Sequence, residues 1–90
     1  MDEARLKRLR MRSWRRGTKE MDLVLGPFAE ERLDALSPEA LDAYEAILAE
    51  NDQDLYRWVS GAEPMPARHA PLLTEIAEAA RARHGPASRP

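Results

Sequence analysis

Cysteine is absent from the chain, and this absence excludes several classes of protein at once. Disulfide frameworks, thiolate metal sites and cysteine nucleophiles cannot be built without it. The four glycines are scattered, so the sequence holds no glycine-rich phosphate-binding loop. The two histidines, His69 and His84, are 15 positions apart and cannot ligate one metal from adjacent helical turns. No apolar run approaches the roughly 20 residues that span a bilayer, so we expect no membrane insertion.

The length bounds the architecture. Ninety residues suffice for one domain with a thin core and leave little room for a deep pocket, which favours a binding module over an enzyme. We predict a single domain over residues 1–85 and a disordered tail over 86–90. The N-terminus lacks the apolar segment of a secretory signal. We therefore expect the protein in the bacterial cytoplasm, or in the mitochondrial matrix if the source is eukaryotic. A monomer is the default expectation for its oligomeric state.

The charges are distributed unevenly along the chain. Residues 1–20 hold eight Lys/Arg and three Asp/Glu, whereas residues 21–66 hold two Arg and eleven Asp/Glu. The net charge of −2 therefore conceals a basic head and an acidic middle. Such asymmetry indicates either a charged partner surface or internal pairing of the two segments.

Helical periodicity recurs throughout, and alternating strand patterns are nearly absent. The pattern predicts an all-α fold, a compact bundle of about five short helices. The expected helices cover about 3–13, 19–36, 38–50, a short stretch from Asn51 or Asp52 to Gly61, and 67–84. Their buried stripes are Leu6 and Leu9; Met21, Val24, Leu25, Phe28 and Leu33; Leu41, Tyr44, Ile47 and Leu48; Leu55, Trp58 and Val59; and Leu72, Leu73, Ile76, Ala77 and Ala80.

Several residues are typical of helix ends. Gly17 is expected to take a left-handed conformation that ends the first helix, and Thr18 to cap the second. Ser37 followed by proline is a helix start. Gly26 and Pro27 interrupt the second helix, and the proline removes a backbone hydrogen bond. We expect a kink there rather than a split, because the apolar stripe continues through Phe28.

The polar clusters show no catalytic or metal-binding pattern. The D-x-D sequence at Asp52 and Asp54 lacks the remaining ligands of a calcium loop and is typical of a charged first helical turn. The carboxylates of the acidic middle fit a solvated helix face. Trp14 suits either the core or an exposed interface anchor.

The segment 15–20 is the most informative one, because it places two arginines, a glycine and a carboxylate between two helices. It is either a solvated basic helix end or a rigid polar knuckle. In the second case the arginine side chains reach a partner's carboxylates or backbone, and Gly17 allows a close approach.

The run from Arg15 to Asp22 resembles the R-G-x-x-E signature of the SdhE-type flavinylation factors, also called the succinate dehydrogenase assembly factor 2 family. The run from Asn51 to Trp58 resembles that family's D-x-D-L-x-x-W stretch. The similarity covers about residues 5–80, nearly the whole chain. Thr18 departs from the pattern, since many relatives carry Met or Leu directly after the glycine.

This resemblance implies a five-helix bundle with no catalytic residue and no cofactor or metal of its own. It implies an assembly factor that binds the flavoprotein subunit of succinate dehydrogenase, with fumarate reductase as a further partner. The factor would promote the covalent attachment of FAD to a histidine of that subunit, a reaction that the partner itself carries out. The predicted partner-binding residues surround the signature: Arg12, Trp14, Arg15, Arg16, Gly17, Glu20 and Asp22.

Two other functions compete with this interpretation. The basic head suits a nucleic-acid-binding module, although the acidic middle would repel phosphates, so we expect no nucleic-acid partner. The second competing function is that of a generic helical module for protein–protein interaction.

Overall fold

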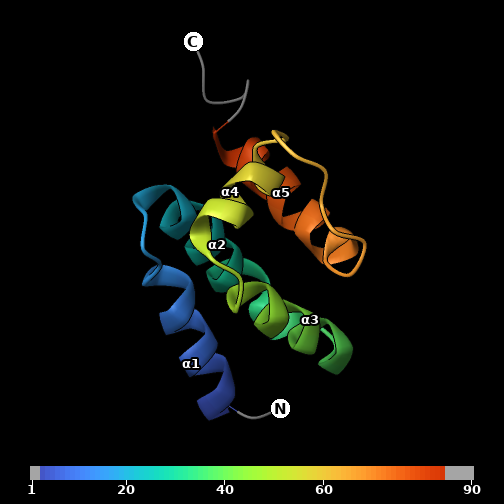
Figure 1. Ribbon diagram of the computed structural model, residues 1–90. Helices are drawn as coiled ribbons and strands as arrows, with labels where there is room; N and C mark the ends of the chain where they lie inside the picture. Colours follow the sequence, from blue (N-terminus) through green and yellow to red (C-terminus); the bar gives the residue numbers. More distant parts are fainter. Residues whose placement is uncertain (1–2, 85–90) are drawn as a thin grey trace.

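The structure is a computed structural model that describes residues 3–84 (Figure 1). In chain order the elements are α1 (Glu3–Trp14), α2 (Lys19–Arg32), the 3-10 helix η1 (Leu33–Ala35), α3 (Pro38–Leu48), α4 (Asp52–Val59) and α5 (Ala70–His84). This range contains no strand, so the predicted all-α class and the five helices are confirmed. Within it, no helix has both the length and the apolar character that crossing a membrane requires. The predicted tail, 86–90, lies outside the described residues.

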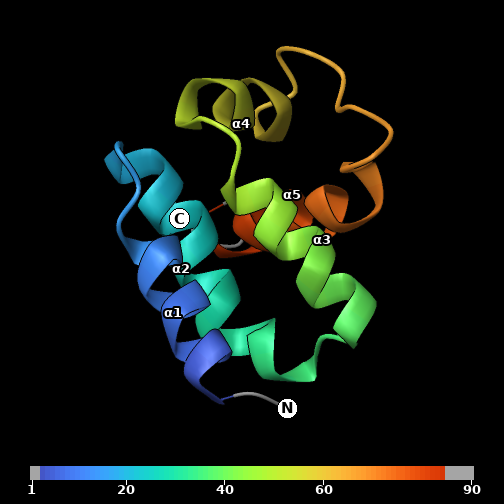
Figure 2. The ribbon, with the colours of Figure 1, turned by 60° about the horizontal axis from the view of Figure 1, so that its bottom comes forward.

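Helix α2 is the central element of the bundle. It packs against α1, α4 and α5, while α3 packs against α1 and α5. Figures 1 and 2 show α4 and the connection between α1 and α2 at one end of the molecule, and the start of α1 at the other end. This arrangement brings two connections that are distant in the sequence side by side.

Two helices begin at the predicted caps, Thr18 and Ser37, and α4 is capped by Asn51, one of the two residues between which the sequence left its cap open. The side chains of Thr18, Ser37 and Asn51 each accept a hydrogen bond from the backbone N–H three residues later, at 3.3, 3.1 and 2.8 Å. Each bond satisfies an N–H group that has no partner within the helix. Gly61, with φ of 87°, follows the last turn of α4 as expected.

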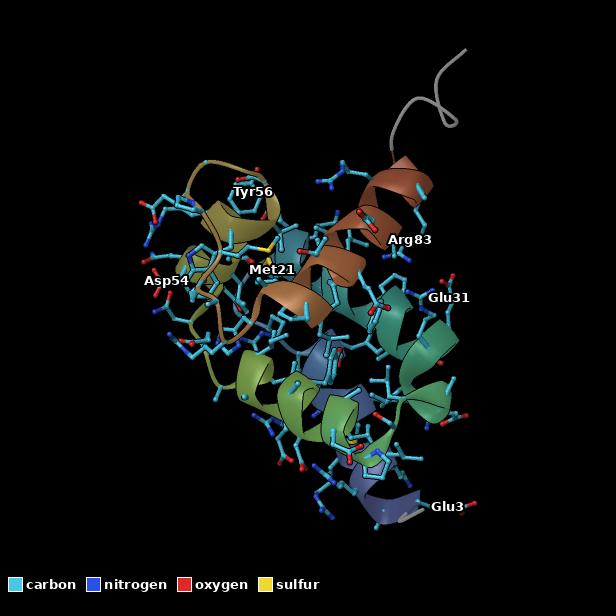
Figure 3. The ribbon with its side chains drawn as sticks, turned by 90° about the vertical axis from the view of Figure 1, so that its right-hand side faces the viewer. Glu3, Met21, Glu31, Asp54, Tyr56 and Arg83 are labelled. Atoms are coloured by element: carbon cyan, nitrogen blue, oxygen red, sulfur yellow. The ribbon has the colours of Figure 1, made fainter. Side chains whose placement is uncertain are left out.

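Some boundaries differ from the prediction. Helix α2 ends at Arg32 and continues as η1, and α5 begins at Ala70 because residues 67–69 form a turn. Helix α2 is continuous through Pro27, so the split into two helices does not occur. Close to this proline, Arg83 of α5 donates a hydrogen bond to the Val24 carbonyl at 3.3 Å. Figure 3 shows the same arginine directed toward Glu31 of α2.

The core consists of the predicted stripes with few exceptions. Val24, Trp58 and Val59 are half-buried at its margin. The remaining predicted positions are buried: Leu6, Leu9, Met21, Leu25, Phe28, Leu33, Leu41, Tyr44, Ile47, Leu48, Leu55, Leu72, Leu73, Ile76, Ala77 and Ala80. Their burial is what holds the helices together, since helices this short are marginal in isolation.

A polar group lies at the centre of this core. Tyr44 of α3 is fully buried, stacks on Phe28 with ring centroids 5.9 Å apart, and places its hydroxyl 2.6 Å from Ser13 Oγ of α1. It also donates to the Leu25 carbonyl of α2 at 3.4 Å. Burial raises the pKa of Tyr44 to about 12, so the hydroxyl stays protonated and can donate. These contacts connect α1, α2 and α3 at one point.

The basic head and the acidic middle pair with each other. Arg5 contacts Asp42 and Glu45 at 2.8 Å, and Arg10 pairs with Asp34. Of the two explanations for the uneven charge, internal pairing is therefore confirmed for these side chains.

Tyr44→Phe is expected to destabilise the fold by about 1–2 kcal/mol, because it removes a buried hydroxyl that bonds both Ser13 and the Leu25 carbonyl. Urea unfolding followed by circular dichroism measures the change. Tyr56→Phe is the matched control. Tyr56 is exposed, so removing its hydroxyl should leave the urea midpoint unchanged. Equal midpoints for the two variants would contradict the structural role of the Tyr44 hydroxyl.

The turn before α5 is tied to the end of α3 by a second polar contact. His69 is buried and its Nε2 lies 2.7 Å from Glu50 Oε2, which also accepts from Arg68 at 2.8 Å. The hydrogen bond from His69, followed by that from Arg68, lowers the pKa of Glu50. The carboxylate is therefore stabilised in the folded state relative to the unfolded state.

Stability should consequently decline in acid. Unfolded chains bind the Glu50 proton at a higher pH than the folded protein does, so this contribution is complete above the ordinary glutamate pKa of about 4.3. It is lost as the pH falls through the lowered folded value. Urea midpoints measured between neutral and acidic pH should therefore fall less steeply for Glu50→Gln than for the wild type. Equal slopes of midpoint against pH for the two proteins would contradict a stabilising contribution from the Glu50 carboxylate.

Candidate functional site

The segment 15–20, called the corner below, connects α1 to α2 and begins the first turn of α2. All of its residues are exposed except Arg16, which is half-buried. The corner lies beside the start of α4, at the end of the bundle opposite η1 (Figure 2). It is therefore on the surface of the domain and open to a partner.

One carboxylate holds the corner in place. Asp52, the first residue of α4, accepts from Arg16 Nε through Oδ1 at 2.7 Å. Its Oδ2 accepts from the backbone N–H groups of Gly17 at 2.6 Å and Thr18 at 3.1 Å. The Arg16 and Asp52 side chains are only 10% and 11% exposed, so water screens this ion pair little. The two sequence features typical of the family are thus in direct contact.

The remaining nitrogens of Arg16 bind the end of α3. Nη1 donates to the Leu48 carbonyl and Nη2 to the Glu50 carbonyl, both at 2.7 Å. Carbonyls at a helix C-terminus have no partner within the helix, so the arginine satisfies them and complements the helix dipole. In addition, the Arg16 backbone N–H donates to Asp22 Oδ1 at 2.7 Å. The Arg16 guanidinium and Asp22 are therefore engaged inside the domain.

Gly17 has no positive φ, and among the described residues only Gly61 does. The prediction that Gly17 ends α1 in a left-handed conformation is therefore wrong, and α1 already ends at Trp14. A Cβ built on Gly17 would meet only Asp52 Oδ2, at 3.4 Å, which is an ordinary van der Waals contact. Neither backbone conformation nor packing inside the domain requires glycine here.

Trp14 packs over α2 and remains 40% exposed. A Cβ on Gly26 would come within 2.4 Å of its ring, so this glycine makes room for the indole. The indole Nε1 donates to Glu30 at 3.0 Å. Gly26 thus serves the packing of Trp14, a role that the sequence did not reveal.

Arg15 is the first residue of the corner, and Arg12 precedes it on α1. Both are exposed, and Arg12 lies 3.7 Å from Glu45, a long ion pair. Within residues 3–84 the Arg15 side chain makes no ion pair, so its charge is available to a partner. Together with Gly17 and Glu20 these side chains are the outward part of the predicted site.

Tyr56 is the residue near the corner that the sequence analysis missed. It is 51% exposed on α4 and shares a surface hollow with Thr18 and Glu20. Figure 3 shows its ring on the outer side of the helix. The signal was present, because Leu55, Trp58 and Val59 define the inward face of α4, and Tyr56 lies about 100° around the helix from Leu55, outside that face.

The polar clusters of the described residues do not form a metal site. No group of three or more histidines and carboxylates within residues 3–84 is arranged to hold a metal ion. Asp54 pairs with Arg57, and Asp52 is occupied by N–H donors, so the D-x-D sequence is not a calcium loop.

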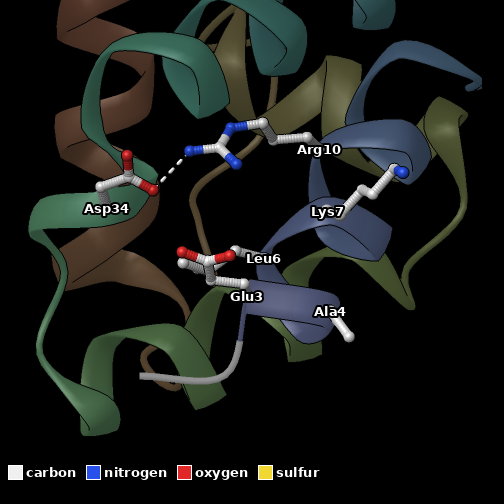
Figure 4. Close-up of a pocket in the computed structure, with 6 residues that line it drawn as sticks. All are labelled: Glu3, Ala4, Leu6, Lys7, Arg10 and Asp34. Carbon is white, nitrogen blue, oxygen red and sulfur yellow. Dashed lines mark hydrogen bonds and ion pairs between the residues drawn. The ribbon is translucent and has the colours of Figure 1, made fainter.

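A second hollow lies at the other end of the bundle, where α1 faces η1 (Figure 4). Acidic and basic side chains balance there, and Arg10 pairs with Asp34. The hollow therefore offers no net charge to a phosphate or a flavin. The residues that line it are Glu3, Ala4, Leu6, Lys7, Arg10 and Asp34.

A family model described as the flavinator of succinate dehydrogenase matches residues 7–80, most of the domain and the whole corner. The chain belongs to this flavinator family. The FAD assembly factor SdhE of Acetobacter pasteurianus is 39% identical over 83 residues, which cover 91% of this chain and 76% of that protein. The resemblance read from the signature is thereby confirmed.

Other relatives of the flavinator family are matched over a shorter part of their length. The mitochondrial succinate dehydrogenase assembly factor 2 of Mycosarcoma maydis is 38% identical over 68 residues, covering 76% of this chain and 29% of that protein. The FAD assembly factor SdhE of Vibrio cholerae is 45% identical over 47 residues, covering 52% of this chain and 55% of that protein. This chain thus spans less than two thirds of the length of these two relatives.

Asp52→Asn in this flavinator-family chain is expected to lower the free energy of unfolding by about 2 kcal/mol. Both oxygens of Asp52 accept from N–H groups, so an amide in either orientation turns its NH₂ toward a donor, and it also removes the charge that the partly buried guanidinium requires. Asp54→Asn is the matched control, because its pair with the exposed Arg57 is worth about 0.5 kcal/mol or less. Urea unfolding of the two variants measures the difference, and equal losses would contradict the special position of Asp52.

Proposed function

We propose that this chain binds the flavoprotein subunit of succinate dehydrogenase and promotes the covalent attachment of FAD to it. The observation that carries the proposal is Gly17, a rigidly held, exposed glycine for which the domain itself has no need. A glycine at such a position is explained by close approach of another protein to the backbone. Membership of the flavinator family identifies the class of that protein.

The proposed role requires no catalytic group in this chain. The partner's histidine and flavin react with each other, and the factor binds the partner so that the reacting groups stay close and correctly oriented. Positioning alone can lower the activation free energy of such a reaction by several kcal/mol, and by up to about 7–11 kcal/mol in well-oriented systems. A small rigid domain without a deep cavity is suited to this task.

The corner is proposed as the centre of the interface. Its outward residues, Arg15, Gly17 and Glu20, would contact the partner, with Arg12 and Trp14 alongside them on α1. Arg16 and Asp22 would act indirectly, because their polar groups hold the corner from inside. A preformed corner binds without the entropic cost of ordering a loop.

The finer features of the proposal concern the partner and the compartment. The flavoprotein subunit of fumarate reductase is a second candidate partner, since the same attachment chemistry would be needed there. We propose that the chain is a monomer when free and acts where the flavoprotein folds, in the bacterial cytoplasm or the mitochondrial matrix. The nucleic-acid-binding alternative has no support from the family, and ion pairs within the domain already engage Arg5, Arg10 and Arg16.

Gly17→Arg is expected to leave the fold intact and to reduce covalent flavin in the partner by at least about tenfold. The long side chain would extend into solvent from an open position and block the approach of the partner. Co-expression of the variant with the flavoprotein, followed by flavin fluorescence in a denaturing gel, measures the attachment. Urea unfolding reports on the fold.

Ala35→Arg serves as the matched control, because Ala35 is exposed in η1 at the opposite end of α2. It adds the same charge and bulk away from the corner, so flavin attachment should equal that of the wild type. Wild-type fluorescence with a folded Gly17→Arg protein would overturn the proposed interface.

A further inference from the structure

A shallow hollow of about 350 Å³ lies beside the corner, between the first turn of α2 and the outer side of α4. This volume is at the small end of the range for ligand pockets, so the hollow suits a single side chain better than a whole FAD molecule. The residues that line it are Thr18, Glu20, Asp52, Gln53, Tyr56 and Arg57.

The charges of the hollow are neutralised except at one residue. Asp52 accepts three hydrogen bonds from the corner, and Arg57 pairs with Asp54 and Glu63. Glu20 is exposed and makes no ion pair or side-chain hydrogen bond to any residue in 3–84. The hollow therefore presents one unpaired carboxylate, and its charge complements a cation.

The aromatic ring of Tyr56 supplies a second feature for recognising a cation. About half of this side chain is accessible, and it makes no hydrogen bond within residues 3–84. Helix α4 already buries Leu55 and packs Trp58 against the core, so the fold does not need the Tyr56 ring. The face of such a ring attracts a guanidinium or ammonium group.

We propose that this hollow binds an arginine side chain of the flavoprotein partner, with its guanidinium paired to Glu20 and stacked on the Tyr56 ring. Arginine fits better than lysine, because a planar guanidinium can form paired hydrogen bonds to a carboxylate while its face lies on an aromatic ring. This inference rests on the proposed function and specifies one contact of that interface.

The test is the dissociation constant between this chain and the flavoprotein subunit, measured by isothermal titration calorimetry. Tyr56→Ala and Glu20→Gln should each weaken binding about tenfold, whereas Tyr56→Phe, which keeps the ring, should retain most of the affinity. Glu39→Gln is the matched control for Glu20, since Glu39 is an exposed carboxylate in the first turn of α3. It should bind like the wild type.

The double variant Glu20→Gln/Tyr56→Ala decides whether one arginine contacts both residues. If it does, the double variant should weaken binding about twentyfold, well short of the roughly hundredfold product of the single effects. The inference would be overturned if the double variant weakened binding by the full hundredfold product. It would also be overturned if Tyr56→Ala bound as tightly as the wild type, or if Tyr56→Phe weakened binding as much as Tyr56→Ala does.

The same titration separates this inference from the proposed function. If wild-type protein binds and Gly17→Arg does not, while Tyr56→Ala binds normally, the interface stands and the arginine contact is wrong. If the flavoprotein does not bind the wild-type chain at all, the proposed function and the inference are both overturned.

Discussion

The ion pair between Arg16 and Asp52 is the interaction on which the arrangement of the proposed site depends. A single carboxylate accepts three N–H donors from the corner, and the same guanidinium bonds two carbonyls at the end of α3. The connection between α1 and α2, the end of α3 and the start of α4 are thereby fixed relative to one another. These polar contacts set the geometry at this edge of the domain.

The same principle explains the uneven charge of the sequence. Four of the eight cations in the basic head, Arg5, Arg10, Arg12 and Arg16, pair with carboxylates of the acidic middle, so about half of the head's charge is neutralised inside the domain. What remains outward near the corner is a small number of unpaired groups, including Arg15 and Glu20. A surface with few free charges of both signs is suited to recognising one partner, whereas a uniformly basic one binds polyanions without selectivity.

Much of the fold could be predicted from the sequence because its signals are local. Helix caps such as Ser37 and buried stripes such as that of α3 depend on residues within one or two turns, and the structure confirms them. The end of α2 was less certain, because Leu33 continues the apolar stripe although the helix has already tightened into η1.

The site was only partly predictable, because its contacts join residues far apart in the chain. The signature around Gly17 was recognised from the sequence. Its hydrogen bond to Asp52, however, joins residues 35 positions apart, and local periodicity gives no sign of such a contact. For the same reason Asp52 looked like an ordinary first-turn acid, and Gly26 like a helix interruption with no bearing on Trp14. Tyr56 was detectable in principle, as an aromatic residue on the polar side of α4.

The central claim is that the corner, held by Asp52, is the surface that meets the flavoprotein. Amide NMR spectra of the isotope-labelled chain, recorded while unlabelled flavoprotein subunit is added, test it most directly. The account predicts that signals of residues 15–20 and of the neighbouring outer side of α4 shift or broaden first, while those of η1 stay in place. Perturbation centred on η1 and the start of α1, with the corner unchanged, would contradict it.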